Sequence, residues 1–467
     1  MAAQPPLLQL PNAQAAAQWL REAGAVHLSA DSRHAGPGQA FVAWPGYAQD
    51  GRAYVASAFE AGAPACLVEQ EGVEVFSFSG ERVASLMDLK QATGEIASAF
   101  YGHPSAELDM VGVTGTNGKT SCTWWMAQAG TLLGRPGGIA GTLGMGEPPS
   151  ARGSGQLAST GLTTPDPITL HRGLRQMRER GLKMCALEAS SIGIVEHRLE
   201  GLRLKVAVFT NLTQDHLDYH GTMQAYWQAK RALFFWPGLQ AAVINTDDAR
   251  GRELARELSR EQSREQSASS QGLDLWTIGT QESCRLRAVD VTQQSQGLSF
   301  DVVETSAEGS QRVKVRSAFI GDYNVHNLLA VIGAWRALGV SLSEVAEVVP
   351  SLSAVPGRMQ SLGCAEQPLV VVDYAHTSDA LEKALSALEP VAAQRGGRLW
   401  CVFGCGGDRD RSKRPLMGSA AASRAEILVV TSDNPRNEAP EQILQDILIF
   451  CRGEVGFDGI FGWQVFG

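Results

Sequence analysis

The sequence predicts an α/β protein of three domains, the central one built on a mostly parallel sheet. The chain has 467 residues, which is more than one hydrophobic core usually serves. Short apolar strands alternate with helical segments, an order typical of parallel sheets. One strand runs straight into a glycine-rich loop and a helix, the arrangement of a phosphate-binding loop.

The first domain is expected at residues 1–104. Phe41–Trp44 is strand-like and ends at a Pro-Gly pair, and residues 65–68 form a second apolar run. Between them, residues 54–63 have the apolar spacing of a helix and a glycine near the end that stops it. Residues 101–109 are polar and rich in turn formers, so we expect a linker there.

The central domain is expected at residues 105–352. Met110–Val113 is the strand that enters the glycine loop, and residues 120–134 continue as a helix. Further apolar strands are expected at 183–190, 205–212 and 240–247, with a helix at 222–235. The polar run 259–272 has almost no apolar residues and predicts a surface loop.

The composition shifts near residues 350–359, and the alternation then restarts. A strand at 369–376, a helix at 379–390 and a strand at 398–407 predict a third, Rossmann-like domain at 353–467. Residues 449–467 have neither a helical nor an alternating period. We therefore expect this domain to be truncated or aberrant at its end.

Charge and cysteine usage exclude several classes of protein. The formal net charge of −9 provides no basic field for nucleic acid. No signal peptide and no apolar run of membrane-spanning length are visible. The eight cysteines form no CxxC pair, so we expect reduced thiols in a cytoplasmic protein without metal-binding cysteines.

The stretch 112-GVTGTNGKTS-121 departs from the usual phosphate-loop pattern, which would place a glycine where Val113 stands. Lys119 follows Gly118 and can neutralise a phosphate held by backbone N–H groups. Thr120 is then placed to put its hydroxyl on Mg²⁺. The alternative is a glycine-rich turn with a solvated lysine, which the strand–loop–helix context disfavours. The loop alone indicates only a nucleotide.

Three further features carry polar residues where ligands collect. Glu188 ends an apolar strand, where ligands bind in open α/β sheets, although a solvated glutamate is an equal alternative. Asp215, His216, Asp218 and His220 follow another strand and suggest a metal or acid/base group, with a capped turn as the alternative. Lys230 lies on a partly apolar helix, where a solvated charge is the ordinary interpretation.

These residues occur in the order Gly115-Thr116-Asn117-Gly118-Lys119-Thr120, Glu188, Thr210-Asn211, Asp215-His216 and Lys230. Together with 163-TTPD-166, 321-GDYNVHNLLA-330, 373-DYAHTSD-379 and 404-GCGGDRDRSKRPLMG-418, this order resembles the Mur ligase family of ATP-dependent amide ligases. The resemblance covers nearly the whole chain. It points to the members that add meso-diaminopimelate to UDP-N-acetylmuramoyl-L-alanyl-D-glutamate through an acyl phosphate during peptidoglycan precursor synthesis.

The resemblance also implies roles for individual residues. Catalysis would involve Lys119, Glu188, His216 and Lys230, with Lys230 carbamylated and Mg²⁺ held by Thr120, Glu188 and His216. ATP would contact Gly115, Thr116, Asn117, Gly118, Lys119, Thr120, Ser121, Asn324 and Arg358. The UDP-muramoyl-dipeptide would contact Ala30, Ser32, Tyr47, Ala48, Gln49, Thr163, Thr164, Ser190, Glu196 and Arg198.

Selection of the amino acid is expected to depend on Asp433-Asn434-Pro435-Arg436, with Arg409 as a second partner. Diaminopimelate has a carboxylate at its far end that lysine lacks, and a planar guanidinium can bind a carboxylate bidentately. Without the resemblance, an Asx-Pro turn with a solvated arginine would be the preferred interpretation.

The chain departs from the family pattern in two places: no Gly-Lys-Gly-His-Glu segment follows residue 436, and Ile192 stands where many relatives have a histidine after Ser-Ser. An active monomeric ligase therefore competes with a nucleotide-binding protein without turnover. A ligase like folylpolyglutamate synthase is the nearest other enzyme. A GTPase is disfavoured because the sequence has no Asn-Lys-x-Asp motif.

Overall fold

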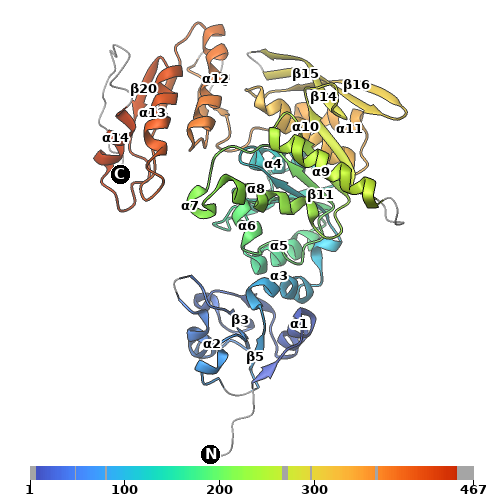
Figure 1. The fold of residues 1–467 in the computed structure, drawn as a ribbon, viewed down its shortest axis with the longest axis vertical. Coiled ribbons are helices and arrows are strands. Elements are labelled where there is room, and N and C mark those ends of the chain that lie inside the picture. The colour runs from blue at the N-terminus through green and yellow to red at the C-terminus, as the bar shows by residue number, and fades with distance from the viewer. Residues whose placement is uncertain are drawn as a thin grey trace, which may run out of the picture.

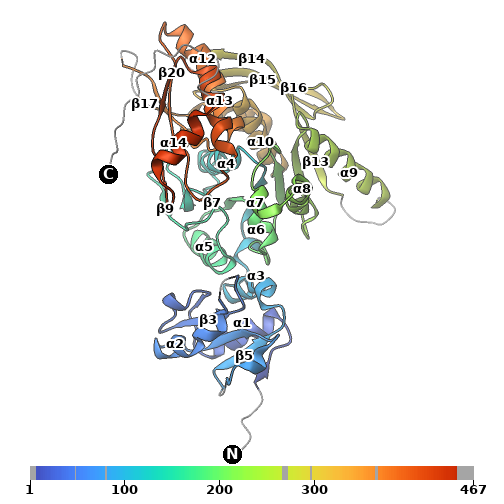
Figure 2. The same ribbon diagram turned by 60° about the vertical axis from the view of Figure 1, so that its left-hand side comes forward.

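The computed structural model describes residues 7–47, 49–78, 81–265, 272–294, 297–362 and 367–449. Figure 1 and Figure 2 show the N-terminal elements and the C-terminal helices at opposite ends of the molecule, with the large central sheet between them. The predicted class, mixed α/β with parallel sheets, is confirmed.

The N-terminal region is built on a five-stranded parallel sheet in the order β1-β5-β4-β3-β2. Its strands are β1 (Leu8–Gln9), β2 (His27–Ser29), β3 (Gln39–Ala43), β4 (Cys66–Glu69) and β5 (Val83–Leu86), and its helices are α1 (Ala13–Glu22), α2 (Val55–Glu60) and α3 (Leu89–Phe100). Leu20 and Ile96 pack on one face of the sheet, and Val55 and Ala58 pack on the other. The expected strands and helix in this region are confirmed to within a few residues.

Helix α3 packs closely against the central region. A Cβ atom on Gly94 would lie 2.3 Å from the carbonyl oxygen of Glu200, so only glycine allows this approach. The Ser98 hydroxyl donates to the carbonyl of Gly201 at 3.0 Å. The segment expected as a linker at 101–109 connects α3 to β6 through turns and a short 3-10 helix at Pro104–Ala106, and its Tyr101 and Leu108 side chains pack into the two adjoining cores.

The central sheet has eleven strands in the order β16-β15-β14-β13-β12-β11-β6-β10-β7-β8-β9. The parallel strands are β6 (Asp109–Thr114), β7 (Gly137–Gly141), β10 (Met184–Glu188), β11 (Val206–Phe209), β12 (Ala241–Asn245), β13 (Asp274–Gly279) and β14 (Leu286–Gln294). Antiparallel strands close both edges: β8 (Gly144–Glu147), β9 (Gln156–Ala158), β15 (Gly297–Ser306) and β16 (Gly309–Ser317). The strand that enters the glycine loop, β6, therefore lies in the interior of the sheet.

Helices cover both faces of this sheet. One core contains apolar residues of α4 (Lys119–Leu132), α10 (Tyr323–Ala337) and α11 (Leu342–Val348). The other contains residues of α5 (Pro167–Glu179), α8 (Met223–Arg231) and α9 (Ala249–Glu265). The short helices α6 (Ser191–Val195) and α7 (Leu217–His220) follow β10 and β11 at the carboxyl edge of the sheet. The predicted helix at 222–235 consists of α8 and a 3-10 turn at Ala232–Phe235.

The surface loop expected at 259–272 is wrong for residues 259–265, which continue α9. Leu254 and Leu258 are buried and fix the start of this helix on the sheet. Arg, Glu and Gln are good helix formers, so the polar run can continue the helix. Residues 266–271 lie outside the described residues.

The C-terminal region contains two separate two-stranded sheets in the described residues. Strands β17 (Gln360–Leu362) and β18 (Val370–Val372) pair antiparallel, whereas β19 (Trp400–Phe403) and β20 (Ile427–Val430) pair parallel. Its helices are α12 (Ser378–Gln394), α13 (Lys413–Arg424) and α14 (Pro440–Leu448). The aberrant end expected at 449–467 lies outside the described residues except for Ile449. The limits proposed for the three domains stay a prediction.

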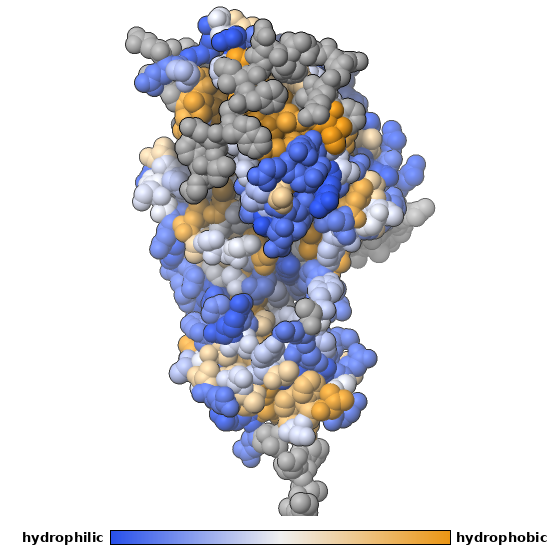
Figure 3. Space-filling model, turned by 90° about the vertical axis from the view of Figure 1, so that its left-hand side faces the viewer, coloured by the Kyte–Doolittle hydropathy of each residue, from blue (hydrophilic) through white to orange (hydrophobic). Residues whose placement is uncertain are grey.

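Some apolar side chains lie on the surface. Trp400 and Val402 are more than half exposed, and Figure 3 shows apolar side chains gathered in the upper part of the face it displays. Six cysteines in the described ranges are free thiols, five of them buried. None of the helices in those ranges combines the length and the apolar character needed to cross a bilayer.

Candidate active site

The glycine loop between β6 and α4 requires its glycines for physical reasons. Gly115 has φ 149° and Gly118 has φ 88°, conformations that residues with a Cβ rarely adopt. A Cβ on Gly115 would lie 1.9 Å from the Thr210 hydroxyl, and one on Gly118 would lie 2.3 Å from the Asn327 side-chain oxygen. The loop thus turns tightly enough to aim the start of α4 at the carboxyl edge of the sheet, where it can receive an anion.

Lys119 begins α4 and folds back under the loop. Its Nζ donates to the carbonyl oxygens of Gly115 and Thr116, both at 2.9 Å. Burial lowers the pKa of Lys119, while the nearby Glu188 carboxylate acts in the opposite sense. The lysine is therefore held at the loop, where a bound phosphate would meet its charge.

Thr120 and Glu188 meet at the carboxyl end of neighbouring strands, as the sequence predicted for a ligand edge. The Thr120 hydroxyl donates to the Glu188 carboxylate at 3.0 Å. Thr142 contributes its backbone N–H to the same carboxylate at 2.8 Å. Glu188 is 1% exposed, so these donors compensate for the cost of burying its charge. The sequence reasoning missed Thr142, which only the pairing of β7 with β10 brings into reach.

Four of the residues expected at the dipeptide cluster next to Glu188. The Thr164 hydroxyl donates to the Glu188 carbonyl at 2.7 Å and lies 2.7 Å from the Ser190 hydroxyl. Arg198 donates to the Thr164 carbonyl at 3.1 Å. The Thr163 hydroxyl accepts from the Thr142 hydroxyl at 3.1 Å. These side chains form one polar surface beside the loop.

The residues that follow β11, Thr210 and Asn211, hold the glycine loop in place through hydrogen bonds to Asn117. The Asn117 N–H donates to the Asn211 side-chain oxygen at 3.0 Å, and the Asn211 amide donates back to the Asn117 carbonyl at 3.1 Å. The Thr210 hydroxyl donates to the same carbonyl at 2.6 Å. Asn117 is thus fixed by its backbone groups. Ser121 is buried in the first turn of α4.

Lys230 is 1% exposed and lies directly below the loop. Its Nζ donates to the Gly115 carbonyl at 2.8 Å and sits 4.3 Å from the centroid of the Tyr226 ring. Burial and the neighbouring Lys119 ammonium lower the pKa of Lys230 well below its usual range. The interpretation of Lys230 as a solvated surface charge is therefore wrong, because its whole helix face packs into the core.

His216 lies at the start of α7 with φ 51°. Burial lowers the pKa of His216, against the opposing effect of the Asp215 carboxylate. Asp215 is buried and pairs with Lys413 of the C-terminal region at 3.0 Å. The positive charges of Lys119 and Lys230 also lower the pKa of His216. No hydrogen bond between the described residues joins His216 to Thr120 or Glu188.

The remaining residues expected at ATP lie on the opposite side of the loop. Asn324 is buried, and its side chain donates to the Ile320 carbonyl at 2.8 Å and accepts from Asn327 at 2.9 Å. Arg358 donates to the Thr120 hydroxyl at 3.4 Å and stacks 4.7 Å from the Tyr374 ring centroid. Arg358 thus connects the C-terminal region to the loop.

Further residues expected at the UDP-muramoyl-dipeptide belong to the N-terminal region, in the turns that follow β2 and β3. Ala30 and Ser32 follow β2, with Ser32 opening a 3-10 turn. Tyr47 is 89% exposed, and the side chain of Gln49 accepts from the Tyr54 hydroxyl. Ala48 lies outside the described residues.

The two arginines expected at the amino acid come from adjacent turns of the C-terminal region. Arg436 has φ 48° and donates to the Gly407 carbonyl at 2.5 Å, and the Gly407 N–H donates to Asn434 at 2.9 Å. Arg409 follows two residues after Gly407. The turn 433–436, with Asp433 and Pro435, therefore packs on the turn that carries Arg409.

The oxygen atoms of Thr120 and Glu188 could provide part of a Mg²⁺ site. Mg²⁺ favours hard oxygen ligands and is usually held by one or two carboxylates together with substrate phosphates. The Thr120 hydroxyl and the buried Glu188 carboxylate provide such oxygens in contact. Among the described residues, no group of three His, Cys, Asp or Glu side chains could enclose a metal ion, so phosphate oxygens would have to complete the coordination.

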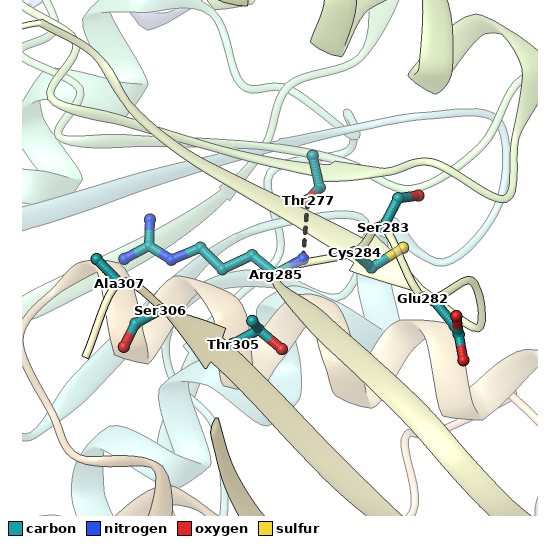
Figure 4. Close-up of a pocket in the computed structure, with 8 residues that line it drawn as sticks. All are labelled: Thr277, Glu282, Ser283, Cys284, Arg285, Thr305, Ser306 and Ala307. Carbon is teal, nitrogen blue, oxygen red and sulfur yellow. Dashed lines mark hydrogen bonds between the residues drawn. The ribbon is translucent and has the colours of Figure 1, made fainter. Parts of the chain in front are cut away.

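A pocket of about 450 Å³ opens elsewhere, at the edge near β13 and β14. Figure 4 shows Cys284 and Arg285 in its wall, with the Arg285 N–H donating to the Thr277 hydroxyl at 2.9 Å. None of the residues expected at ATP or substrate lines this pocket.

Comparison with known proteins decides the family. The Mur ligase family catalytic domain matches residues 26–101, the Mur ligase middle domain matches residues 113–335 and the Mur ligase glutamate ligase domain matches residues 357–457. A UDP-N-acetylmuramoyl-L-alanyl-D-glutamate--2,6-diaminopimelate ligase of Acidovorax sp. (strain JS42) is 53% identical over 93% of this chain and 84% of its own length. The chain belongs to the Mur ligase family.

Two further relatives support this membership. The ligase of the same name from Janthinobacterium sp. (strain Marseille) is 47% identical over 92% of this chain and 83% of its own length. A solved structure of a UDP-N-acetylmuramoyl-L-alanyl-D-glutamate--2,6-diaminopimelate ligase is 34% identical, with a TM-score of 0.67 over 94% of this chain and 84% of that one. The sequence similarity and the structural similarity to this family thus both extend over most of the chain.

Proposed function

We propose that the chain is an ATP- and Mg²⁺-dependent, ADP-forming ligase that adds meso-diaminopimelate to UDP-N-acetylmuramoyl-L-alanyl-D-glutamate in peptidoglycan precursor synthesis. The names of relatives at 53% and 47% identity support this activity. The observation that carries it in the structure is the contact between Thr120 and the buried Glu188 at the end of the glycine loop. A simple glycine turn would not need a buried carboxylate there.

The glycine loop is proposed to bind the phosphates of ATP. Backbone N–H groups at the start of α4 face the anion, and Lys119 supplies a positive charge. Thr120 and Glu188 would hold Mg²⁺, which neutralises phosphate charge when bound. His216 is proposed as a further ligand, and Asn324 and Arg358 as contacts to the rest of the nucleotide.

The chemistry proceeds in two displacements. A carboxylate oxygen of the D-glutamyl side chain attacks the γ-phosphorus, the bond to the β-phosphate oxygen breaks, and an acyl phosphate and ADP form. The amine of diaminopimelate then attacks the acyl carbon, loses a proton and expels phosphate. Lys119 stabilises the charge of the transferring group, and positioning supplies much of the remaining acceleration.

The polar surface of Thr163, Thr164, Ser190 and Arg198 is proposed to hold the muramoyl-dipeptide, because it lies beside Glu188 and the loop. Ala30, Ser32, Tyr47, Ala48 and Gln49 would contact the uridine end on the N-terminal sheet. Arg409 and Arg436, with Asp433, Asn434 and Pro435, would take the far carboxylate and amine of diaminopimelate.

Lys230 is proposed to carry a carbamate. A buried lysine with a depressed pKa presents a neutral amine, which can attack the carbon of CO₂ and release a proton. The product is anionic and keeps one N–H for the Gly115 carbonyl. Its oxygens would ligate or orient a cation next to the phosphates, where a bare ammonium would repel one.

A substrate-omission assay tests the proposal. Steady-state ADP release should require the UDP-dipeptide and diaminopimelate together, with lysine a poor replacement. Steady-state ADP release that does not depend on the amino acid, or no ADP release at all, would indicate a nucleotide-binding protein without ligase turnover. Turnover with a folate and glutamate would indicate the folylpolyglutamate type instead. We also propose a cytoplasmic monomer, which light scattering of the purified chain would check.

A further inference from the structure

Glu196 receives side-chain donors from three separate elements. It caps the C-terminal end of α6. Tyr47 donates its hydroxyl to Glu196 Oε1 at 2.6 Å, and Lys90 donates to Oε2 at 2.6 Å. Tyr219 of α7 also donates its hydroxyl to Oε1. The partners come from the N-terminal region on one side and from α7 on the other.

The carboxylate is well suited to hold these partners. The Glu196 side chain is 11% exposed, so its ion pair with Lys90 is screened less than a surface pair. Burial disfavours ionisation, but the hydrogen bonds from Lys90, Tyr219 and Tyr47 outweigh it and hold the pKa of Glu196 at about 2. The group is therefore ionised at any ordinary working pH.

Helix α7 depends on such contacts because it has no buried residues of its own. Polar contacts attach it to α6 at both ends of that helix: His220 lies 2.9 Å from the Ser191 hydroxyl, and Tyr219 reaches Glu196. The His220 ring also lies 5.2 Å from the Tyr226 ring, and the Tyr226 hydroxyl lies 3.2 Å from that of Thr116 in the glycine loop. The position of α7 thus affects residues at the loop.

The N-terminal side of the contact packs closely against the central region. Lys90 lies in the first turn of α3, and the same helix approaches the Glu200–Gly201 turn so closely that Gly94 admits no side chain. Lys90 is thereby a fixed anchor, and its ammonium also sits 5.3 Å from the Tyr47 ring centroid. Glu196 lies between this anchor and α7.

We infer that Glu196 is a positioning residue that fixes α7, and with it the Asp215–His216 turn, against the N-terminal region. Its two oxygens already accept three donors, which uses most of the acceptor capacity of a carboxylate. The role goes beyond the direct substrate contact expected for Glu196. Its catalytic consequence depends on the proposed ligase function, whereas the ordering of α7 does not.

Hydrogen exchange of the purified chain without substrates tests the inference directly. In Glu196→Ala, the amides of residues 219–221 should exchange at least about tenfold faster than in the wild type, since a hydrogen bond to a charged group is lost. Glu196→Gln, which keeps an acceptor, should show a smaller increase, and Tyr219→Phe an increase at the same amides. Glu200→Gln, a matched change on the next turn, should leave them unchanged. Amides of α5 serve as the reference for an intact fold.

Unchanged exchange at residues 219–221 in Glu196→Ala would overturn the inference. If α5 also loosens in that variant, Tyr219→Phe, which removes one hydroxyl, decides by the same criterion. Kinetics add a second readout: a positioning role, which acts through the Asp215–His216 turn and the glycine loop, lowers kcat and raises the KM for ATP as well as the KM for the UDP-dipeptide. A rise in the KM for the UDP-dipeptide alone, with normal exchange, would show a direct contact instead. An inactive wild type would refute the ligase proposal and leave the exchange result standing.

Discussion

Replacing Lys230 separates a structural lysine from a functional carbamate. Lys230→Met keeps most of the side-chain volume and removes the amine. The Gly115 carbonyl loses the 2.8 Å bond from Lys230 but keeps the 2.9 Å bond from Lys119, so no buried acceptor is left without a partner. We therefore expect the free energy of unfolding to change by less than about 1.5 kcal/mol, the scale of a single hydrogen bond.

Activity should respond far more strongly than stability. Removing one preorganised group from a charge-stabilising site typically lowers kcat by about 10²–10³-fold, or roughly 2.7–4 kcal/mol. Lys230→Ala should lose activity to the same degree and also leave space beside the Tyr226 ring. A short carboxylic acid in the buffer could then occupy the position of the carbamate and restore part of the turnover.

The assay measures ADP release under saturating substrates, with and without added formate or acetate. Urea unfolding of the same samples shows whether the fold is intact. The control is Lys383→Ala, on the exposed side of α12 with an ion pair to Asp379. Its ADP release should equal that of the wild type, both with and without the added acid. Wild-type turnover in a folded Lys230→Ala would refute the carbamate reasoning.

Three further predictions concern other parts of the site. Lys119→Ala should abolish ATP-dependent ligation with the fold intact, because the charge at the loop contributes several kcal/mol in a site shielded from water; full activity in this variant would end the phosphate-loop assignment. Arg436→Ala should raise the KM for diaminopimelate by about ten- to a hundredfold and leave that for ATP unchanged, since a charge-assisted pair is lost; Arg424→Ala on α13 is the control, and an unchanged KM would remove Arg436 from the amino-acid site. The pKa of Glu196 falls from 4.5 to about 2 on folding, so its contribution to stability is complete above about pH 5 and is lost as the pH falls towards 2. Urea unfolding should therefore show a difference in the free energy of unfolding between the wild type and Glu196→Gln that shrinks over this range. A difference that stays constant would contradict the ion pair.

Several features of the site follow from sequence rules because they depend on local order along the chain. A strand, a tight glycine turn and a helix predict where Lys119 and Thr120 lie, and the strand-end rule places Glu188 beside them. These predictions need only the period of the apolar residues and the special geometry of glycine.

Other features depend on contacts between distant segments, which no local pattern encodes. Tyr47 and Glu196 meet although 149 positions separate them, and Thr142 reaches Glu188 only through the order of the strands. The polar end of α9 was expected as a loop because its composition lacks apolar residues, yet buried Leu254 and Leu258 fix the helix that it continues. The sequence around Lys230 predicts an ordinary surface charge, whereas the structure shows that its face of the helix is buried.

The transfer of oxygen from substrate to phosphate tests the proposed chemistry most directly. The D-glutamyl side-chain carboxylate of the UDP-dipeptide is labelled with heavy oxygen, and the phosphate released on reaction with ATP and diaminopimelate is analysed by mass spectrometry. An acyl phosphate requires the attacking carboxylate oxygen to leave with the phosphate, so each phosphate should carry one labelled oxygen. Unlabelled phosphate accompanying amide formation would contradict the acyl-phosphate route and, with it, the role assigned to the glycine loop and Glu188.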